Sequence, residues 1–319
     1  MTARLRTSGH PFPMPLLSSA VADSTRKTAL ICRPSRFVVL ALLAISCGMM
    51  RASAQATPES PSELIQKAVD NEIAANDTAA RFSFTDLKET SHGSQTELLI
   101  ETNEAMAGMV VAINGKPLTA EQRRAEDSRL ARLLNNPDEL RRKQKSEKED
   151  SERVDRIMKA LPEAFLYEPD GTEIGGQSAG KRGDPLVRLK FHPNPKYRPP
   201  TRVEQVLEGM QGFVSIDAKQ HRIARIDGTL SHEVSFGWGI LGHLDKGGHF
   251  FVEQADVGGR WEITRMDLAF SGKILLIKSL TIKSNEVFGD FRSVPPNLTF
   301  AQGVEVLKKQ AAEWTEKHR

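Results

Sequence analysis

The chain has 319 residues, of which 39% are hydrophobic and 27% charged, and its formal net charge is +3. Its two cysteines, Cys32 and Cys47, both lie near the N-terminus. The rest of the chain therefore forms no disulfide and offers no thiol for catalysis or metal binding. The roughly 265 residues that follow can bury about three quarters of their unfolded surface in a hydrophobic core.

The first 54 residues are predicted to be a signal peptide with a long n-region. Arg33 and Arg36 precede an apolar run that begins at Phe37, and residues 52–56 contain two overlapping A-x-A cleavage sites. The run is about 14 residues long, which is shorter than the roughly 18–20 residues that cross a bilayer. The order of these three parts predicts export.

We expect cleavage near Ala54 or Ala56, which gives a periplasmic or secreted protein. A lipoprotein acylated at Cys47 is the less favoured alternative, because Ala44 stands where a lipobox carries leucine. An uncleaved membrane anchor is a further alternative.

Cleavage also changes the charge balance. Residues 1–54 hold seven of the 44 basic residues and one of the 41 acidic residues, so the remaining chain has a net charge of −3. The basic charge of the whole chain belongs to the signal, and no electrostatic footprint for nucleic acid remains.

The mature chain opens with a predicted helix over residues 61–75, in which Ser60 and Glu63 form a capping box around Pro61. Strands are predicted over residues 81–85, 96–102 and 109–113. The last of them ends at the turn that Asn114 and Gly115 form.

Residues 118–162 are predicted to form a charged helical excursion between two strands. Thr119 starts a first helix, which Pro137 ends, and a second helix follows. No apolar residue occurs between Arg141 and Arg153, so this stretch has nothing to bury and is expected to stand in water. A mobile arm or lid that docks on a partner is the alternative.

Two further strands are predicted over residues 164–167 and 185–191, followed by a short helix that Thr201 caps. From residue 212 to residue 292 the chain reads as a series of strands with turns of two to four residues. Such turns force neighbouring strands to be antiparallel. Thr299 caps a C-terminal helix over residues 299–317.

One long strand of this series is predicted from Thr229 to Leu241. Large side chains lie on one of its sides, and small residues such as Ser235 lie on the other, which leaves room for a helix or a ligand. The large side chains are Val234, Phe236, Trp238 and Ile240. A change of phase at Arg265 predicts a β-bulge and a bent sheet.

These elements predict an α+β fold, mainly antiparallel β, with a strongly curved sheet or incomplete barrel covered by helices and a charged helical excursion. We expect residues 55–319 to form one domain. The surplus of apolar strand surface either encloses a cavity or is filled by the helices as ordinary core.

No catalytic motif is present. His232 and Glu233 begin a zinc-protease motif, but Phe236 stands where its second histidine belongs. His243, His249 and Asp245 flank one turn, although histidines near hairpin ends are more often solvated. There is also no nucleophile elbow, P-loop or dinucleotide fingerprint. We therefore expect no enzyme, no metal and no cofactor.

Residues 212–217, the hairpin return at residues 222–226 and the strands after them resemble the LolA/LolB type of periplasmic carrier for outer-membrane lipoproteins. The resemblance covers residues 61–118 and 163–293. It implies a curved, incomplete barrel whose apolar cavity is covered by helices and shields acyl chains in transit. The helical excursion and the C-terminal helix depart from the family pattern.

The sequence therefore predicts an exported carrier-like protein that binds a lipid or an acylated lipoprotein, contacts membranes transiently and does not bind nucleic acid. The residues expected to line its apolar pocket are Val234, Phe236, Trp238, Phe251, Trp261 and Phe270. An envelope interaction protein that docks through residues 119–161 is the first alternative. A hydrolase or metal enzyme around His232 and His243 is the second.

Overall fold

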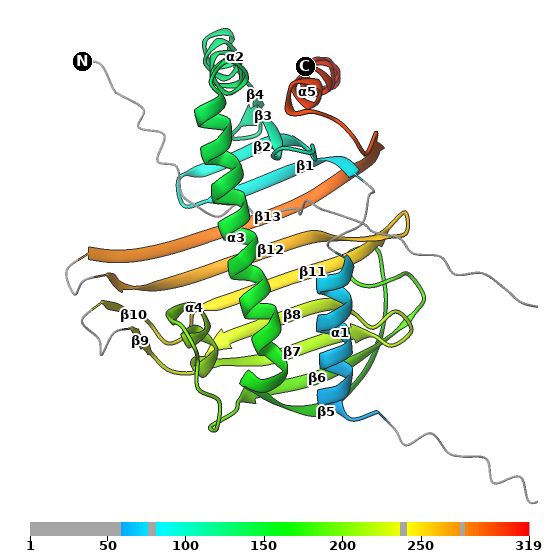
Figure 1. The fold of residues 1–319 in the computed structure, drawn as a ribbon, viewed down its shortest axis with the longest axis vertical. Coiled ribbons are helices and arrows are strands. Elements are labelled where there is room, and N and C mark those ends of the chain that lie inside the picture. The colour runs from blue at the N-terminus through cyan, green and yellow to red at the C-terminus, as the bar shows by residue number, and fades with distance from the viewer. Residues whose placement is uncertain (1–58, 76–80, 237–240, 275–277, 319) are drawn as a thin grey trace, which may run out of the picture.

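The computed structural model describes residues 59–75, 81–236, 241–274 and 278–318. These residues form one open antiparallel sheet and five α-helices (Figure 1). The predicted α+β class with a curved, mainly antiparallel sheet is confirmed. The predicted signal peptide, its cleavage sites and Cys47 lie outside the described residues. Among the helices described, none is long and apolar enough to cross a membrane.

The helices begin and end close to the predicted positions. They are α1 (Pro61–Ala75), α2 (Ala120–Asn135), α3 (Pro137–Ala164), α4 (Arg202–Gln205), which continues as a 3-10 turn η1 (Val206–Gly209), and α5 (Phe300–Lys317). Thr119 and Thr299 form the predicted capping boxes, in which each threonine accepts from the backbone N–H of a glutamine three residues later.

The strands follow in chain order. They are β1 (Arg81–Thr90), β2 (Gly93–Ile100), β3 (Ala107–Ile113), β4 (Lys116–Pro117), β5 (Phe165–Ile174), β6 (Pro185–Pro193), β7 (Met210–Asp217), β8 (Arg222–Leu230), β9 (Val234–Phe236), β10 (Gly242–Leu244), β11 (His249–Val257), β12 (Arg260–Ile274) and β13 (Lys278–Val294).

The order across the sheet is β4-β3-β2-β1-β13-β12-β11-β8-β7-β6-β5. Strands β9 and β10 form a short hairpin that attaches to β12. The N-terminal strands therefore lie at one end of the sheet, β5–β8 lie at the other, and β11–β13 lie between them. The antiparallel pair of β1 and β13 joins the first group to the rest.

This order explains the long charged helix. Strands β4 and β5 are consecutive in the chain but lie at opposite edges of the sheet, so their connection must cross its whole width. At 1.5 Å per residue, the 28 residues of α3 span about 42 Å. Ten strand spacings of about 4.8 Å make a similar distance. Helix α3 runs across one face of the sheet from edge to edge (Figure 1).

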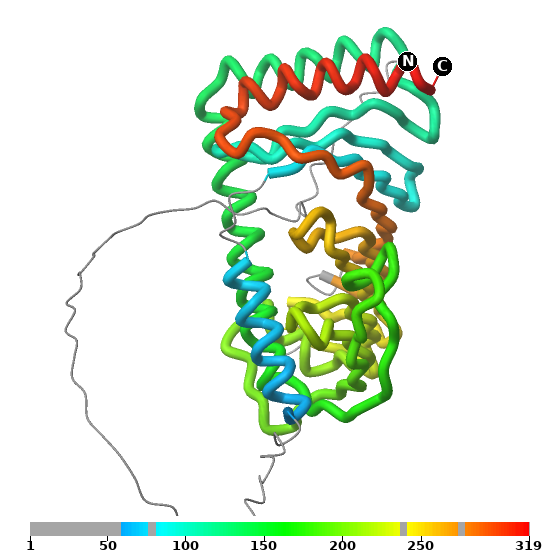
Figure 2. Tube along the Cα trace, turned by 90° about the vertical axis from the view of Figure 1, so that its right-hand side faces the viewer, coloured from blue at the N-terminus to red at the C-terminus, as the bar shows by residue number. Residues whose placement is uncertain are grey.

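Two hydrophobic clusters lie at the two ends of the sheet. The upper cluster lies at the β4 end of the sheet, at the top of Figure 1. In it, α2 and α5 pack on β2 and β3 around Leu130, Phe300 and Leu307. In the lower cluster, at the β5 end of the sheet, α1, η1 and the C-terminal part of α3 pack on β5–β8 around Ile65 and Ile216. Figure 2 shows the sheet curving so that its ends approach the helices while its centre bows away.

Local features of the strands test the remaining predictions. The turn at Asn114 and Gly115 is present, with φ of 52° and 71°. The predicted bulge at Arg265 is confirmed, because the register of β11 and β12 shifts at this residue. The single strand predicted from Thr229 to Leu241 is wrong. Strand β8 ends at Leu230, and a separate strand pairs with β10 instead.

Candidate functional site

Helix α3 turns one face toward the sheet, and the chemistry of that face changes along its length. Seven residues at alternating spacings of three and four form this stripe: Leu140, Lys143, Glu147, Asp150, Val154, Ile157 and Leu161. All of them are buried or half-buried, whereas Lys145 and Lys148 on the opposite side are exposed. The stripe is apolar at both ends and charged at its three central positions.

The charged centre of the stripe is held by polar contacts. Lys143 Nζ lies 2.7 Å from Glu147 Oε1. The other oxygen of Glu147 accepts a hydrogen bond of 3.1 Å from the backbone N–H of Met106. Asp150 is 3% exposed, and its Oδ1 lies 2.7 Å from Arg153 Nη2. These partners offset part of the cost of removing charged groups from water.

The sheet surface that faces the helices is apolar along β11 and β12. Phe250 pairs with Leu268, and Val252 pairs with Met266. Phe250 and Phe270 pack against the lower cluster. Val252 and Met266 are buried but belong to none of the hydrophobic clusters that the described residues form. An apolar strip therefore runs from the lower cluster to the centre of the sheet.

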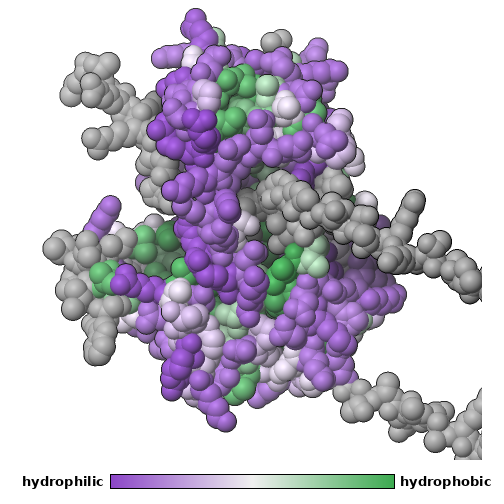
Figure 3. Space-filling view, viewed as in Figure 1, coloured by the Kyte–Doolittle hydropathy of each residue, from purple (hydrophilic) through white to green (hydrophobic). Residues whose placement is uncertain are grey.

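The surface view agrees with this arrangement. Figure 3, viewed from the helix side, shows a hydrophilic band along α3 with hydrophobic surface on both sides of it. Helix α3 packs on α1, α2, α4 and β5 rather than closely on the central strands. The apolar centre of the sheet thus lies opposite the charged part of the helix stripe.

Carboxyl groups occupy the same sheet face nearer to β1. Asp86 is the cross-strand neighbour of Glu97, and Glu286 of β13 forms an ion pair of 2.6 Å with Lys88. Burial, with the charges of Glu286 and Glu97, raises the pKa of Asp86 to about 7. Burial also raises the pKa of Glu97, although Arg129 opposes the shift. At this end of the face Asp86 is therefore a carboxyl group that is still partly protonated near neutral pH.

The predicted pocket residues do not form one surface. Val234 belongs to the lower cluster, and Phe236 and Phe270 pack against it. Trp238 lies outside the described residues. Trp261 belongs to a separate small cluster with Leu186 and Ala224, and its Nε1 donates a hydrogen bond of 2.8 Å to Gln220.

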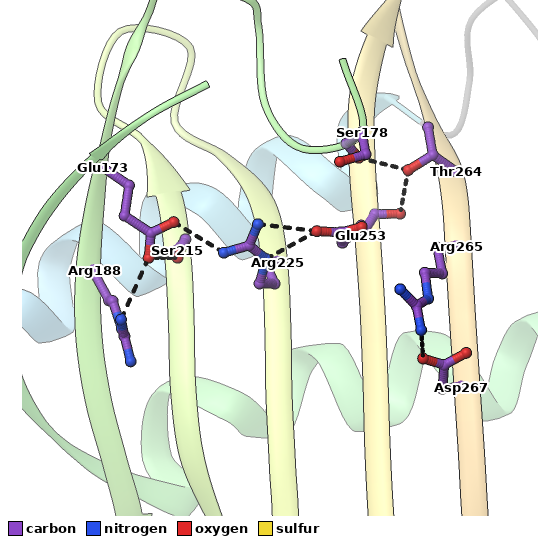
Figure 4. A network of polar contacts seen from close by, with 9 residues as sticks. All are labelled: Glu173, Ser178, Arg188, Ser215, Arg225, Glu253, Thr264, Arg265 and Asp267. Atoms are coloured by element: carbon purple, nitrogen blue, oxygen red, sulfur yellow. Dashed lines mark hydrogen bonds and ion pairs between the residues drawn. The ribbon is translucent and has the colours of Figure 1, made fainter. Parts of the chain in front are cut away.

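Phe251 lies on the other face of the sheet. The guanidinium of Arg265 lies 5.2 Å from the centroid of its ring, on the face of the sheet where Figure 4 shows a network of ion pairs across neighbouring strands. In this network Arg225 pairs with Glu253 at 2.9 Å and with Glu173 at 2.9 Å. Phe251 thus lies on the face away from the helices and Trp261 in a separate cluster, and the pocket expected from the six residues stays a prediction.

A hollow of about 330 Å³ lies over the central strands β12 and β13 and the end of β1. Its lining residues are Glu89, Thr90, Asp267, Leu268, Ala269, Lys283, Ser284 and Asn285. Its volume reaches the lower end of the usual range for ligand sites. However, it is lined mainly by polar residues and contains none of the six predicted pocket residues.

The histidines group differently from the prediction. His243 Nε2 lies 3.3 Å from Asp245 Oδ1, on the side of the strand that leads into the turn. His249 instead pairs with Asp227 at 2.9 Å. Glu233, which the sequence associates only with an incomplete zinc-protease motif and not with His243, joins His243 and Asp245, and one ligand atom from each lies within 4.8 Å of the others. His232 is exposed, with its Nδ1 3.0 Å from Ser231 Oγ.

Sequence reasoning missed the central stripe of α3 and the carboxyl groups of β1, β2 and β13. A signal for the stripe exists, because the three-and-four spacing of Val154, Ile157 and Leu161 continues backward through charged residues to Leu140. Nothing comparable marks Asp86, since its neighbour Glu286 belongs to a strand about 200 residues away along the chain.

The described residues define an α+β protein with an open antiparallel sheet that a partly charged helix bridges. No family model matches the chain, and no curated protein matches it. Among solved structures, it is similar to a DUF1329 family protein from Desulfovibrio piger ATCC 29098, with 13% sequence identity and a TM-score of 0.29. The match covers 78% of this chain and 100% of that one.

Proposed function

We propose that this is an exported binding protein that holds an acyl chain between helix α3 and the helix-facing surface of β11 and β12. One observation carries the proposal: the apolar side chains of Val252, Met266 and Leu268 lie opposite the charged residues of α3. A helix that served only as a cover for these strands would present apolar residues to them, as α3 does at both ends. The role proposed is binding, without catalysis.

The energetics suit an acyl chain. Transfer of a methylene group from water to an apolar surface contributes about 0.8 kcal/mol. A chain that covers the strip from Phe270 to Met266 would also remove water from the side chains beneath it. The polar contacts of Glu147 and Asp150 would remain available to the water or head group on the helix side.

The carboxyl groups near β1 define the head group that we expect. Asp86, Glu97 and Glu286 lie beyond the apolar strip on the same face. Negative charge there repels an anionic head group, while the protonated form of Asp86, whose pKa is raised to about 7, can donate a hydrogen bond to a phosphate or ester oxygen. We therefore propose a zwitterionic or neutral amphiphile rather than a fatty-acid anion.

Displacement of a fluorescent acyl probe tests the proposal. Lysophosphatidylcholine should displace the probe from the purified protein, and a fatty acid of equal chain length should do so at least about fivefold more weakly at pH 8. Leu268→Gln places an amide in the strip and should weaken displacement by about tenfold, since a buried unpaired amide costs about 1–3 kcal/mol.

The matched control is Val287→Gln. Val287 is an exposed apolar residue on the opposite face of β13, 42% exposed, so this substitution should leave lipid binding unchanged. Equal losses from Leu268→Gln and Val287→Gln would contradict the proposed location. Absence of lipid binding in the wild-type protein, with no lipid in its organic extracts, would contradict the function itself.

A further inference from the structure

The β9–β10 hairpin brings together a set of metal-binding side chains on the outer face of the sheet. In its register, Leu244 pairs with Val234 and His243 pairs with Ser235. Continued by one residue, the register places Glu233 opposite Asp245. Side chains alternate along a strand, so His243, Asp245 and Glu233 project from the same side of the ladder.

The distances suit one shared ion. His243 Nε2 and Asp245 Oδ1 are 3.3 Å apart, which is about the separation of two ligands that bind one metal ion at roughly 2.0–2.2 Å each. A carboxylate oxygen of Glu233 lies within 4.8 Å of both. Glu233 is exposed, so a rotation of its side chain brings this oxygen into coordination distance without moving the backbone.

Neighbouring hydroxyl groups orient both carboxylates. Ser271 Oγ donates a hydrogen bond of 2.7 Å to Asp245 Oδ2, which leaves Oδ1 directed toward His243. Ser235 Oγ donates a hydrogen bond of 3.1 Å to Glu233 Oε1. Outer hydrogen bonds of this kind fix the direction of metal ligands in known sites.

We propose that Glu233, His243 and Asp245 bind a divalent first-row transition-metal ion such as Zn²⁺, with water completing its coordination. One imidazole nitrogen and two carboxylate oxygens suit such an ion, whereas Mg²⁺ favours oxygen ligands alone. The ion would tie β9 to β10. Each of these strands has only three residues, and β10 in turn pairs with β12. This proposal does not depend on lipid binding.

The same face provides a matched control. His249 Nε2 pairs with Asp227 Oδ1 at 2.9 Å, and this histidine–carboxylate pair has no third ligand in the metal-ligand groups that the described residues form. A site built by all three residues requires His243 and not His249. Binding by scattered surface carboxylates would depend on neither histidine.

Isothermal titration of the metal-stripped protein, without a histidine tag, tests the proposal with ZnCl₂ and MgCl₂. The wild-type protein should bind one Zn²⁺ per chain and show a higher melting temperature with Zn²⁺. His243→Ala should weaken binding by about a hundredfold and Glu233→Gln by about tenfold, whereas His249→Ala should have no effect.

Several outcomes would overturn the proposal: no saturable Zn²⁺ binding, equal losses from His243→Ala and His249→Ala, or Mg²⁺ binding of equal strength that also requires His243. Circular dichroism establishes whether each variant folds. If His243→Ala does not fold, Glu233→Gln decides the question, because Glu233 is exposed and its replacement keeps the size of the side chain.

Discussion

The two ends of the sheet and its centre are covered in different ways. At the upper end, α5 places Phe300, Val304 and Leu307 directly on the strands, and all three are at most 1% exposed. At the centre, α3 crosses β11–β13 with charged residues on the side that faces them. Helix α3 therefore packs into the hydrophobic core at its two ends and bridges the sheet between them.

This difference shows how the fold tolerates a polar helix over an apolar surface. Leu140 is anchored in the upper cluster and Leu161 in the lower one, so α3 is positioned by its ends. Its centre is then free of the requirement to pack on the sheet. The stretch from Arg141 to Arg153 is thus exposed on one side and buried or half-buried on the other, and docking of a partner through residues 119–161 stays a prediction.

The largest difference between the ends and the centre should appear in stability. Phe300→Ala removes a fully buried ring from the upper cluster and should lower the free energy of unfolding by about 3–5 kcal/mol. Leu268→Ala, in the half-buried strip at the centre, should cost about 1 kcal/mol or less. Urea unfolding measures both changes. Equal losses would mean that the centre is packed as tightly as the ends.

Elements with local signals could be predicted from the sequence. The capping boxes at Thr119 and Thr299 fix helix starts within one turn, and short turns fix the antiparallel hairpins, because both depend on neighbouring residues. The bulge at Arg265 also has a local cause, since a change of phase is visible within one strand.

Long-range pairings could not be predicted in this way. Ser83 pairs with Arg292, and this pairing of β1 with β13 sets the strand order and thereby the course of α3. The face of a strand also depends on its partners. The apolar character of Phe251 predicts a place in the pocket, but its register with Asp267 puts it on the outer face. Only part of the candidate site was therefore accessible from the sequence.

The carboxyl groups at the upper edge of the central face should make stability depend on pH. The pKa of Asp86 is raised from 3.8 to about 7 in the folded protein, so the folded state binds its proton more tightly than the unfolded state. Stability should therefore fall as the pH rises from about 4 through about 7, by on the order of 2–4 kcal/mol from this group. Glu262, whose pKa burial raises to about 7, contributes in the same direction.

Asp86→Asn mimics the protonated form and should remove the part of this decline that Asp86 causes. The variant should unfold at a higher temperature than the wild-type protein at pH 8 and at a similar temperature at pH 4.5. Glu89→Gln, at an exposed position of the same strand, is the control and should leave the pH dependence unchanged. If the variant is no more stable than the wild-type protein at pH 8, ionisation of Asp86 does not destabilise the folded protein.

The smallest effects should separate the two sides of α3. Glu147→Ala on the inner stripe leaves the backbone N–H of Met106 without its acceptor and Lys143 without its ion pair, and should cost about 1–2 kcal/mol. Lys148→Ala removes only an exposed contact of 3.9 Å to Glu152 and should cost less than about 0.5 kcal/mol. Both substitutions place alanine in the same helix, so a difference in helix propensity does not explain the result. If urea unfolding gave equal values, the charged centre of α3 would be solvated on both sides, and its inner contacts would not hold the bridge in place.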